Sequence, residues 1–170
     1  MKDKLLHIYY GDGKGKTTAA IGLAYRCANR GKKVLFTSFL KGKNSGEFVK
    51  DGPFEVDDFD FCNKFWCQMT EEEKNTATNC ANKRLINIAE NYKKYDMIIL
   101  DEFLDAILVG CVDKKYAMDM INTMYGNVEI VITGHSRIDE IFDLADYITE
   151  MKSEKHPFDK GICAREGIEF

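Results

Sequence analysis

Short apolar runs alternate along this chain with longer segments in which apolar side chains recur every three or four residues. The runs lie near residues 5–10, 33–40, 96–102, 128–133 and 147–151, and the helical spacing covers 17–29, 70–92, 117–124 and 138–145. Short apolar runs predict buried strands, and the longer period predicts helices that pack on them. Their alternation predicts a mostly parallel sheet with helices on both faces.

Several element ends carry recognisable signals. A capping box, T-E-E-E from Thr70 to Glu73, predicts the start of the longest helix, and Ser136 with Asp139 forms a second cap-like pair. Gly31 and Gly126 are expected to end the helices that precede them. The polar segment 41–53 predicts a loop, and the weak alternation over 54–61 predicts one more strand.

Composition narrows the class of protein. The chain has 170 residues, 45% of them hydrophobic, which predicts a single domain over 1–170. A net charge of -4 gives no global basic field, so we expect no nucleic-acid partner. The sequence lacks an apolar run of about 18 residues and a signal-peptide cleavage site, so we expect a cytoplasmic protein with no membrane partner.

Six cysteines are scattered along the chain without a C-x-x-C pair. This spacing argues against both a zinc site and a disulfide framework. We expect most of them to be small side chains of the core.

The stretch 8-IYYGDGKGKTTAA-20 has the features of a phosphate-binding loop between a strand and a helix. The usual signature is G-x-x-x-x-G-K-[ST], and here Tyr10 stands where the first glycine belongs. Backbone N–H groups of a glycine-rich loop and the following helix N-terminus suit phosphate oxygens. Lys16 is the candidate for the outer phosphates and Thr17 for Mg²⁺. The candidate nucleotide-binding residues are Gly11, Asp12, Gly13, Lys14, Gly15, Lys16, Thr17 and Thr18; the alternative is a flexible turn.

Two carboxylates follow the apolar run of residues 97–100. Asp101 and Glu102 stand where a protein with such a loop keeps the acid that holds Mg²⁺ directly or through water. An acidic pair in this place can instead cap a helix. Because parallel strands end at one edge of the sheet, the loop, this pair and His135 are expected to meet there.

Phe65 and Trp66 lie in the connection before the longest helix. Aromatic side chains in a loop either fill a core or offer a surface for a flat ligand. The irregular ending 150–170 contains Phe158, Ile162 and Ile168, which indicates that part of it packs, across the ligand mouth or a partner subunit.

These segments together closely resemble the P-loop type of ATP:corrinoid adenosyltransferases. The resemblance rests on GDGKGKTTAA at 11–20, F-L-K-G…G-E over 39–47, I-L-D-E at 99–102, I-T-G at 132–134 and E-M-K…K-H-P-F-D-K-G-I at the end, and it runs essentially from end to end. It implies a P-loop NTPase-like (RecA-like) three-layer α/β sandwich. It also makes the missing glycine a family trait.

The resemblance implies transfer of the 5′-deoxyadenosyl group of ATP to the cobalt of a reduced corrinoid, with triphosphate released. Thr17 and Glu102 are the implied Mg²⁺ ligands, and Lys16, Phe65 and Trp66 are the candidate catalytic residues. The two aromatics are the candidates for displacing the lower axial ligand of the corrinoid, which makes Co(II) easier to reduce. A homodimer and an electron-donating flavoprotein are also implied.

The sequence departs from the family pattern at three points. Phe65 and Trp66 are adjacent where the pattern has F-x-W, Asp12 replaces a frequent asparagine, and His135 stands where an arginine is common. Two other functions stay open at this point. One is a P-loop ATPase or small-molecule kinase, and the other is a corrinoid- or nucleotide-binding relative with weak activity.

Overall fold

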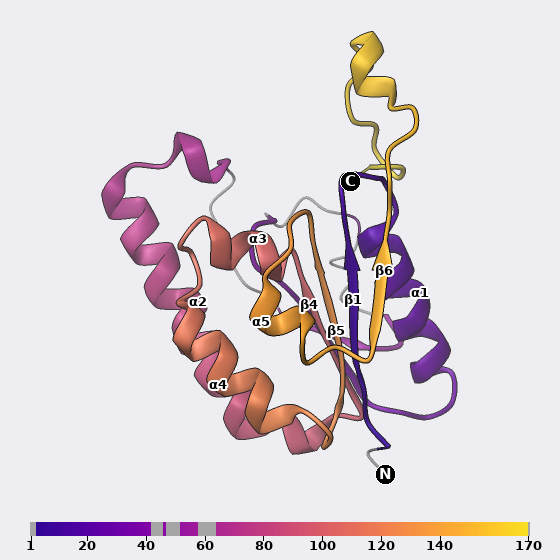
Figure 1. Ribbon diagram of the computed structural model, residues 1–170, viewed down its shortest axis with the longest axis vertical. Coiled ribbons are helices and arrows are strands. Elements are labelled where there is room, and N and C mark those ends of the chain that lie inside the picture. The colour runs from indigo at the N-terminus through magenta and orange to yellow at the C-terminus, as the bar shows by residue number, and fades with distance from the viewer. Residues whose placement is uncertain (1–2, 42–45, 47–51, 58–63, 170) are drawn as a thin grey trace.

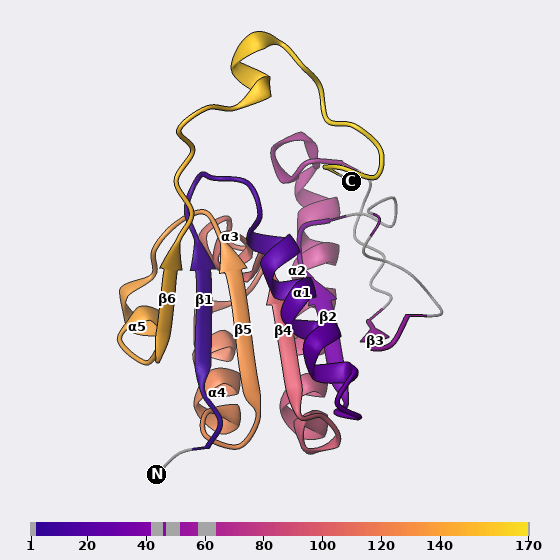
Figure 2. The same ribbon diagram turned by 90° about the vertical axis from the view of Figure 1, so that its right-hand side faces the viewer.

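Six parallel strands form one sheet at the centre of the molecule (Figures 1 and 2). The computed structural model describes residues 3–41, 46, 52–57 and 64–169. In the order β3-β2-β4-β5-β1-β6, every neighbouring pair of strands is parallel. The strands are β1 (Leu6–Tyr10), β2 (Val34–Ser38), β3 (Glu55–Val56), β4 (Met97–Asp101), β5 (Glu129–Gly134) and β6 (Tyr147–Glu150). The predicted α/β class is therefore confirmed.

Helices cover both faces of this sheet, which makes three layers. The helix α1 (Lys16–Ala28) lies on one face, and α2 (Glu71–Asn91), α3 (Phe103–Leu108), α4 (Lys114–Met124) and α5 (Asp139–Phe142) lie on the other (Figure 1). Within the described ranges, short 3-10 helices lie at Trp66–Gln68, Tyr92–Lys94 and Pro157–Lys160. Each face has its own buried cluster. The α1 side contains Ala20, Ala24, Phe36 and Ile99, and the other side contains Leu85, Leu100, Phe103 and Ile132.

Side-chain caps fix where the two longer helices of the second face begin. The Thr70 hydroxyl accepts a hydrogen bond from the Glu73 amide at 3.2 Å, and the Glu73 carboxylate accepts one from the Thr70 amide at 2.8 Å, which confirms the predicted capping box. The Asp113 carboxylate accepts hydrogen bonds from the first-turn amides of α4, so that helix begins three residues before the apolar spacing indicated.

The second predicted cap is wrong. Ile138 occupies the N-cap position of α5 without a side-chain hydrogen bond, and α5 is a single turn. Asp139 instead accepts a hydrogen bond from the Arg137 guanidinium at 2.6 Å. The helix α3 has six residues and was not predicted, because it directly continues the apolar run of β4. Of the predicted strand 54–61, the structure describes residues 54–57; residues 58–61 and most of the 41–53 loop lie outside the described ranges.

The prediction for the cysteines is partly wrong. The five cysteines within the described ranges are free thiols, and Cys111 alone among them is fully buried. Cys67, Cys80 and Cys163 are exposed, because they lie in a single helical turn, on the outer side of α2 and in the chain ending. Among the helices that the structure describes, none is long and apolar enough to cross a membrane.

We expect opposite effects from alanine at two glycines of this fold. A methyl group on the Cα of Gly134, at the end of β5, would come within 2.5 Å of Leu104 Cβ in α3. Overpacking of this kind costs about 1–3 kcal/mol, so Gly134→Ala lowers the free energy of unfolding. Gly22, in the middle of α1, has open space around it, and Gly22→Ala raises that free energy by about 0.5–1 kcal/mol. Urea-induced unfolding followed by circular dichroism measures both, and equal midpoints would contradict the packing described here.

Candidate nucleotide and magnesium site

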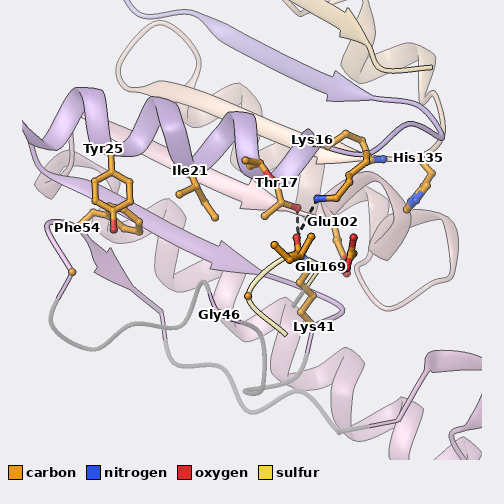
Figure 3. A pocket seen from close by; sticks show the side chains of 16 residues that line it. Lys16, Thr17, Ile21, Tyr25, Lys41, Gly46, Phe54, Glu102, His135 and Glu169 are labelled. Carbon is orange, nitrogen blue, oxygen red and sulfur yellow. Dashed lines mark hydrogen bonds between the residues drawn. The ribbon is translucent and has the colours of Figure 1, made fainter. Parts of the chain in front are cut away.

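A pocket of about 420 Å³ opens at the carboxyl ends of the strands, where the sequence placed the site (Figure 3). Its charged lining side chains are Lys14, Lys16, Lys41, Glu102, His135 and Glu169. Apolar and aromatic side chains, Ile21, Tyr25 and Phe54, line another part of it. The pocket therefore joins a polar region with three lysines to an aromatic region, a combination that suits a nucleotide.

The glycine-rich loop divides into two parts with different contacts. Lys14, Gly15, Lys16, Thr17 and Thr18 line the pocket. Asp12 and Gly13 instead form hydrogen bonds with the chain that follows β6, and Gly11 forms one with the residue that follows β5. This division was not visible in the spacing of the glycines.

Backbone hydrogen bonds attach the first part of the loop to neighbouring segments. The Gly13 amide donates to the Met151 carbonyl at 2.7 Å, and the Gly11 amide donates to the His135 carbonyl at 3.1 Å. A methyl group on Gly13 would come within 2.8 Å of the Met151 and Lys152 backbone. Gly11 has a φ of 108°, a conformation that favours glycine. These two glycines therefore permit a close approach between backbones.

Lys16 lies at the start of α1 with its ammonium close to the loop. Its Nζ donates a hydrogen bond to the Gly13 carbonyl at 2.8 Å. Burial lowers the pKa of Lys16, while the carboxylates of Asp105, Asp12, Glu102 and Asp101 act in the opposite direction. The ammonium therefore lies in a partly desolvated position beside the pocket, where its attraction for phosphate oxygens is stronger than in water.

Asp101 is the centre of a hydrogen-bond network beneath the pocket. Its side chain is fully buried. One carboxylate oxygen accepts hydrogen bonds from the hydroxyls of Thr17 and Thr133, both at 2.8 Å. The other accepts one from the Ser38 hydroxyl at 3.3 Å and pairs with Lys41 Nζ at 3.0 Å. The strand ends of β2, β4 and β5 and the start of α1 are thus joined through one carboxylate.

Glu102 has an unusual backbone conformation. Its φ of 56° makes it the one residue other than glycine with a positive φ in the described ranges. Its amide donates to the Thr133 hydroxyl at 2.9 Å, and its side chain lies at the pocket beside Lys41 and Thr17 (Figure 3). Although Glu102 occupies the N-cap position of α3, its side chain makes no capping hydrogen bond. The alternative in which this acid only caps a helix is therefore wrong.

The protonation of Glu102 predicts how the stability of the protein depends on pH. Burial and the adjacent Asp101 carboxylate raise the pKa of Glu102 to about 7 from the ordinary 4.5. A carboxyl group with a raised pKa contributes stability below its unfolded-state pKa and loses that contribution as pH rises through the folded-state pKa. In EDTA, the free energy of unfolding of the wild type is expected to fall from pH 5 to pH 8.

Glu102→Gln is the matched variant for this measurement, because an amide keeps the shape without the titration. We expect a smaller loss of stability between pH 5 and pH 8 in Glu102→Gln than in the wild type, measured by urea-induced unfolding in EDTA. Parallel pH profiles for the two proteins would contradict the assignment of the titration to Glu102.

His135 is paired with an acid that the sequence did not reveal. Its Nδ1 and its backbone N–H both lie 3.0 Å from Asp105 Oδ2. This contact raises the pKa of the His135 imidazole. His135 lines the pocket, as the sequence indicated, whereas Asp105 belongs to the unpredicted helix α3.

The two adjacent aromatic residues have different environments. The Phe65 side chain is 77% exposed, and Trp66 is half-buried and packs against the core. The chain turns between them, because Phe65 is extended and Trp66 begins a turn of 3-10 helix. Neither lines the nucleotide pocket. Of these two aromatic residues, Phe65 is therefore accessible to a ligand, and Trp66 is largely a core residue.

Sequence reasoning missed three contributors to the pocket. Tyr25 and Phe54 pack edge to face with ring centroids 5.3 Å apart, but they are far apart in the sequence. Lys41 follows β2 at the same edge of the sheet as the other site residues, a position that could have identified it.

The chain ending also lines the pocket, as the sequence indicated. It contributes Gly167–Glu169, and Lys14 Nζ donates a hydrogen bond to the Ile168 carbonyl at 3.1 Å. The expected place of the ending at the ligand mouth is therefore confirmed.

The fold is similar to that of a solved structure of another protein. A solved structure of the replication initiator DnaA bound to AMPPCP and single-stranded DNA matches with a TM-score of 0.51 and 12% sequence identity, covering 98% of this chain and 49% of that one. Identity at this level shows a common fold and nothing further.

Sequence comparisons are more specific. The family model ATP:corrinoid adenosyltransferase BtuR/CobO/CobP matches residues 2–170. The corrinoid adenosyltransferase CobA of Salmonella typhimurium is 32% identical, and that of Escherichia coli K12 is 30% identical; each match covers 98% of this chain and 85% of the relative. The corrinoid adenosyltransferase of Pseudomonas aeruginosa is 28% identical over 98% of this chain and 83% of the relative. The chain therefore belongs to the ATP:corrinoid adenosyltransferase family.

Proposed function

We propose that the protein transfers the 5′-deoxyadenosyl group of ATP to the cobalt of a reduced corrinoid, with the residues of the pocket in the roles given below. The observation that carries this proposal is the hydrogen bond from Thr17 to Asp101 at 2.8 Å, beneath a pocket lined by Lys14, Lys16 and Lys41. It joins the phosphate loop to the acid of β4, as nucleotide sites of this fold require.

The reaction needs charge stabilisation more than proton transfer. Co(I) supplies the electron pair of the new Co–C bond to C5′ of the ribose, and the C5′–O bond breaks with its electron pair on the triphosphate. Negative charge therefore grows on the leaving phosphate chain. Lys16 and the backbone N–H groups at the start of α1 are proposed to stabilise that charge. The adenosine and the corrinoid must also be held so that C5′ faces the cobalt.

The residues of the site fit a magnesium ion. Hydroxyl and carboxylate oxygens, which Mg²⁺ prefers, meet at Thr17, Asp101 and Glu102, and the Lys41 ammonium already lies among them. The described residues contain no group of three His, Cys, Asp or Glu side chains suited to a metal. A magnesium ion bound through substrate phosphates and water needs only one or two protein carboxylates. We propose that Thr17 and Glu102 hold it, with Asp101 orienting Thr17; when bound, Mg²⁺ supplies positive charge at the triphosphate.

Phe65 and Trp66 are proposed to form the aromatic surface that meets the corrinoid. The exposure of Phe65 supports a direct contact with the lower face of the ring, and the packing of Trp66 supports the backbone that presents it. An aromatic side chain in the place of the lower axial ligand leaves Co(II) four-coordinate. Axial ligands influence the reduction potential of a metal ion, so removal of this ligand favours reduction of Co(II) to Co(I).

Three further features are proposed with the reaction. A flavoprotein delivers the electron, because Co(II) must be reduced by one electron. The cytoplasm is the proposed location, because a reducing compartment preserves Co(I). The protein is proposed to act as a homodimer, which sedimentation velocity can test directly.

One anaerobic assay separates the proposed reaction from its alternatives. The protein is incubated with MgATP and chemically reduced cobalamin, and the products are a light-sensitive Co–C species and triphosphate. An ATPase or kinase would release diphosphate instead. A binding relative with weak activity would retain ATP and yield neither product, and either result would overturn the proposal.

A further inference from the structure

The Lys41 ammonium contacts two of the side chains that surround the proposed magnesium site. Its Nζ is 3.0 Å from the Thr17 hydroxyl oxygen and 3.0 Å from Asp101 Oδ2. Thr17 in turn donates to Asp101 Oδ1 at 2.8 Å, so these three side chains form a closed ring of contacts. Figure 3 shows Thr17 and Lys41 of this ring at the pocket. The Lys41 charge also acts on Glu102, where it opposes the rise in the pKa of that carboxyl.

This arrangement gives the buried Asp101 carboxylate a countercharge without any metal. A buried carboxylate costs free energy unless it is paired and hydrogen-bonded. Hydroxyl groups of Thr17, Ser38 and Thr133 supply the hydrogen bonds, and Lys41 supplies the charge. The site is thereby organised before substrate enters.

A magnesium ion on the Thr17 hydroxyl would be repelled by the Lys41 ammonium in this place. The ion and the Lys41 ammonium would both contact the Thr17 hydroxyl oxygen. With a metal–oxygen distance of about 2.1 Å, the ion would lie no more than about 5 Å from Lys41 Nζ. Two like charges at that distance in a partly buried site repel strongly. This repulsion favours a movement of Lys41 away from Thr17 and Asp101 when the ion binds. It lines the same pocket as Lys14 and Lys16, so oxygens of a bound triphosphate are within its reach as new partners.

We propose that Lys41 is a resident counter-ion, which occupies the magnesium position in the free protein and moves to the triphosphate when Mg²⁺ and nucleotide enter together. The inference rests on the proposed Thr17 magnesium site. It has a consequence for the order of binding: free metal binds weakly because it must displace Lys41, and triphosphate removes that obstacle. Metal and triphosphate thus assist each other beyond their direct attraction.

The test measures Mn²⁺ binding by electron paramagnetic resonance, with no nucleotide and no corrinoid present. Lys41→Met is expected to lower the Kd for Mn²⁺ by about 10- to 100-fold relative to the wild type, the range for removing one competing hydrogen bond to a charged group. Lys41→Gln, which keeps a polar side chain without the charge, is expected to act in the same direction. Lys114→Met removes the same charge from an exposed pair with Glu140 and is expected to leave the Kd unchanged.

A thermal measurement supports the same distinction. In EDTA, Lys41→Met is expected to have a lower Tm than the wild type, because Asp101 loses its countercharge. Addition of Mg²⁺ alone is expected to raise the Tm of Lys41→Met more than that of the wild type. The wild type is expected to need Mg²⁺ with inorganic triphosphate for a comparable rise.

The outcomes separate this inference from the proposed function. An unchanged or higher Kd for Mn²⁺ in both Lys41 variants would overturn the counter-ion role and leave the magnesium site intact. An equal decrease in Lys114→Met would show an effect of net charge and would also overturn it. Absence of Mn²⁺ binding in all proteins, even with triphosphate, would overturn the magnesium site itself.

Discussion

Replacing Lys16 with alanine is expected to lower kcat/KM for adenosyl transfer by about 10²–10³-fold, the loss found when one preorganised charge-stabilising group is removed. The physical reason is the position of the Lys16 ammonium, which is partly desolvated and held 2.8 Å from the Gly13 carbonyl at the phosphate loop. Negative charge grows on the leaving triphosphate, and alanine at this position offers no charge to stabilise it. The measurement is the initial rate of Co–C bond formation with chemically reduced cobalamin.

Lys152→Ala serves as the control for this variant. Lys152 is an exposed lysine that pairs with Glu150 outside the pocket, so its loss changes the net charge by the same amount. Binding of inorganic triphosphate, measured by calorimetry, is expected to weaken in Lys16→Ala and not in the control. Unchanged triphosphate affinity in Lys16→Ala would refute the assignment of the phosphate loop.

Replacing Phe65 with alanine is expected to separate the two steps that we propose for this site, reduction of Co(II) and transfer of the adenosyl group. With Co(II) cobalamin and an electron donor, we expect adenosylation to fall by about 10- to 100-fold, the usual cost of altering the surroundings of a metal centre. With chemically prepared Co(I), the loss is expected to be much smaller, because the reduction is already complete. The reason is that a side chain 77% exposed beside α2 is free to occupy the lower face of the corrinoid.

The neighbouring aromatic provides the comparison. Trp66 packs against the core, so Trp66→Ala is expected to lower the free energy of unfolding as well as both rates. Phe65→Ala is expected to leave unfolding unchanged. Spectra of bound Co(II) distinguish four- from five-coordinate cobalt, and a full four-coordinate signal in Phe65→Ala would exclude the proposed role.

The sequence predicted those parts of the site that follow from local pattern. The order of strands and helices, the loop around Lys16 and the acids after β4 each have a signal within a few residues. Strands of a parallel sheet end at one edge, which was sufficient to predict that Thr17 and Asp101 meet. The capping box at Thr70 was equally local and was also confirmed.

The features that were missed depend on contacts between distant segments. The pairing of Lys41 with Asp101 joins residues 60 positions apart, and the Tyr25–Phe54 contact depends on where β3 lies beside α1. The helix α3 was missed because its buried residues continue the apolar run of β4 without a turn signal. The exposure of Cys80 could not be predicted either, because the segments that pack against α2 determine which of its faces is buried.

The attachment of Gly11 to the residue after β5, and of Gly13 to the segment after β6, has a consequence for how this protein tolerates sequence change. The contacts run from backbone to backbone, through the carbonyls of His135 and Met151. They make no demand on the Lys152 side chain, which is exposed. They do fix the spacing of the chain between β6 and the pocket. Insertions or deletions there, rather than substitutions, are the changes that would reach the phosphate loop from the other end of the sequence.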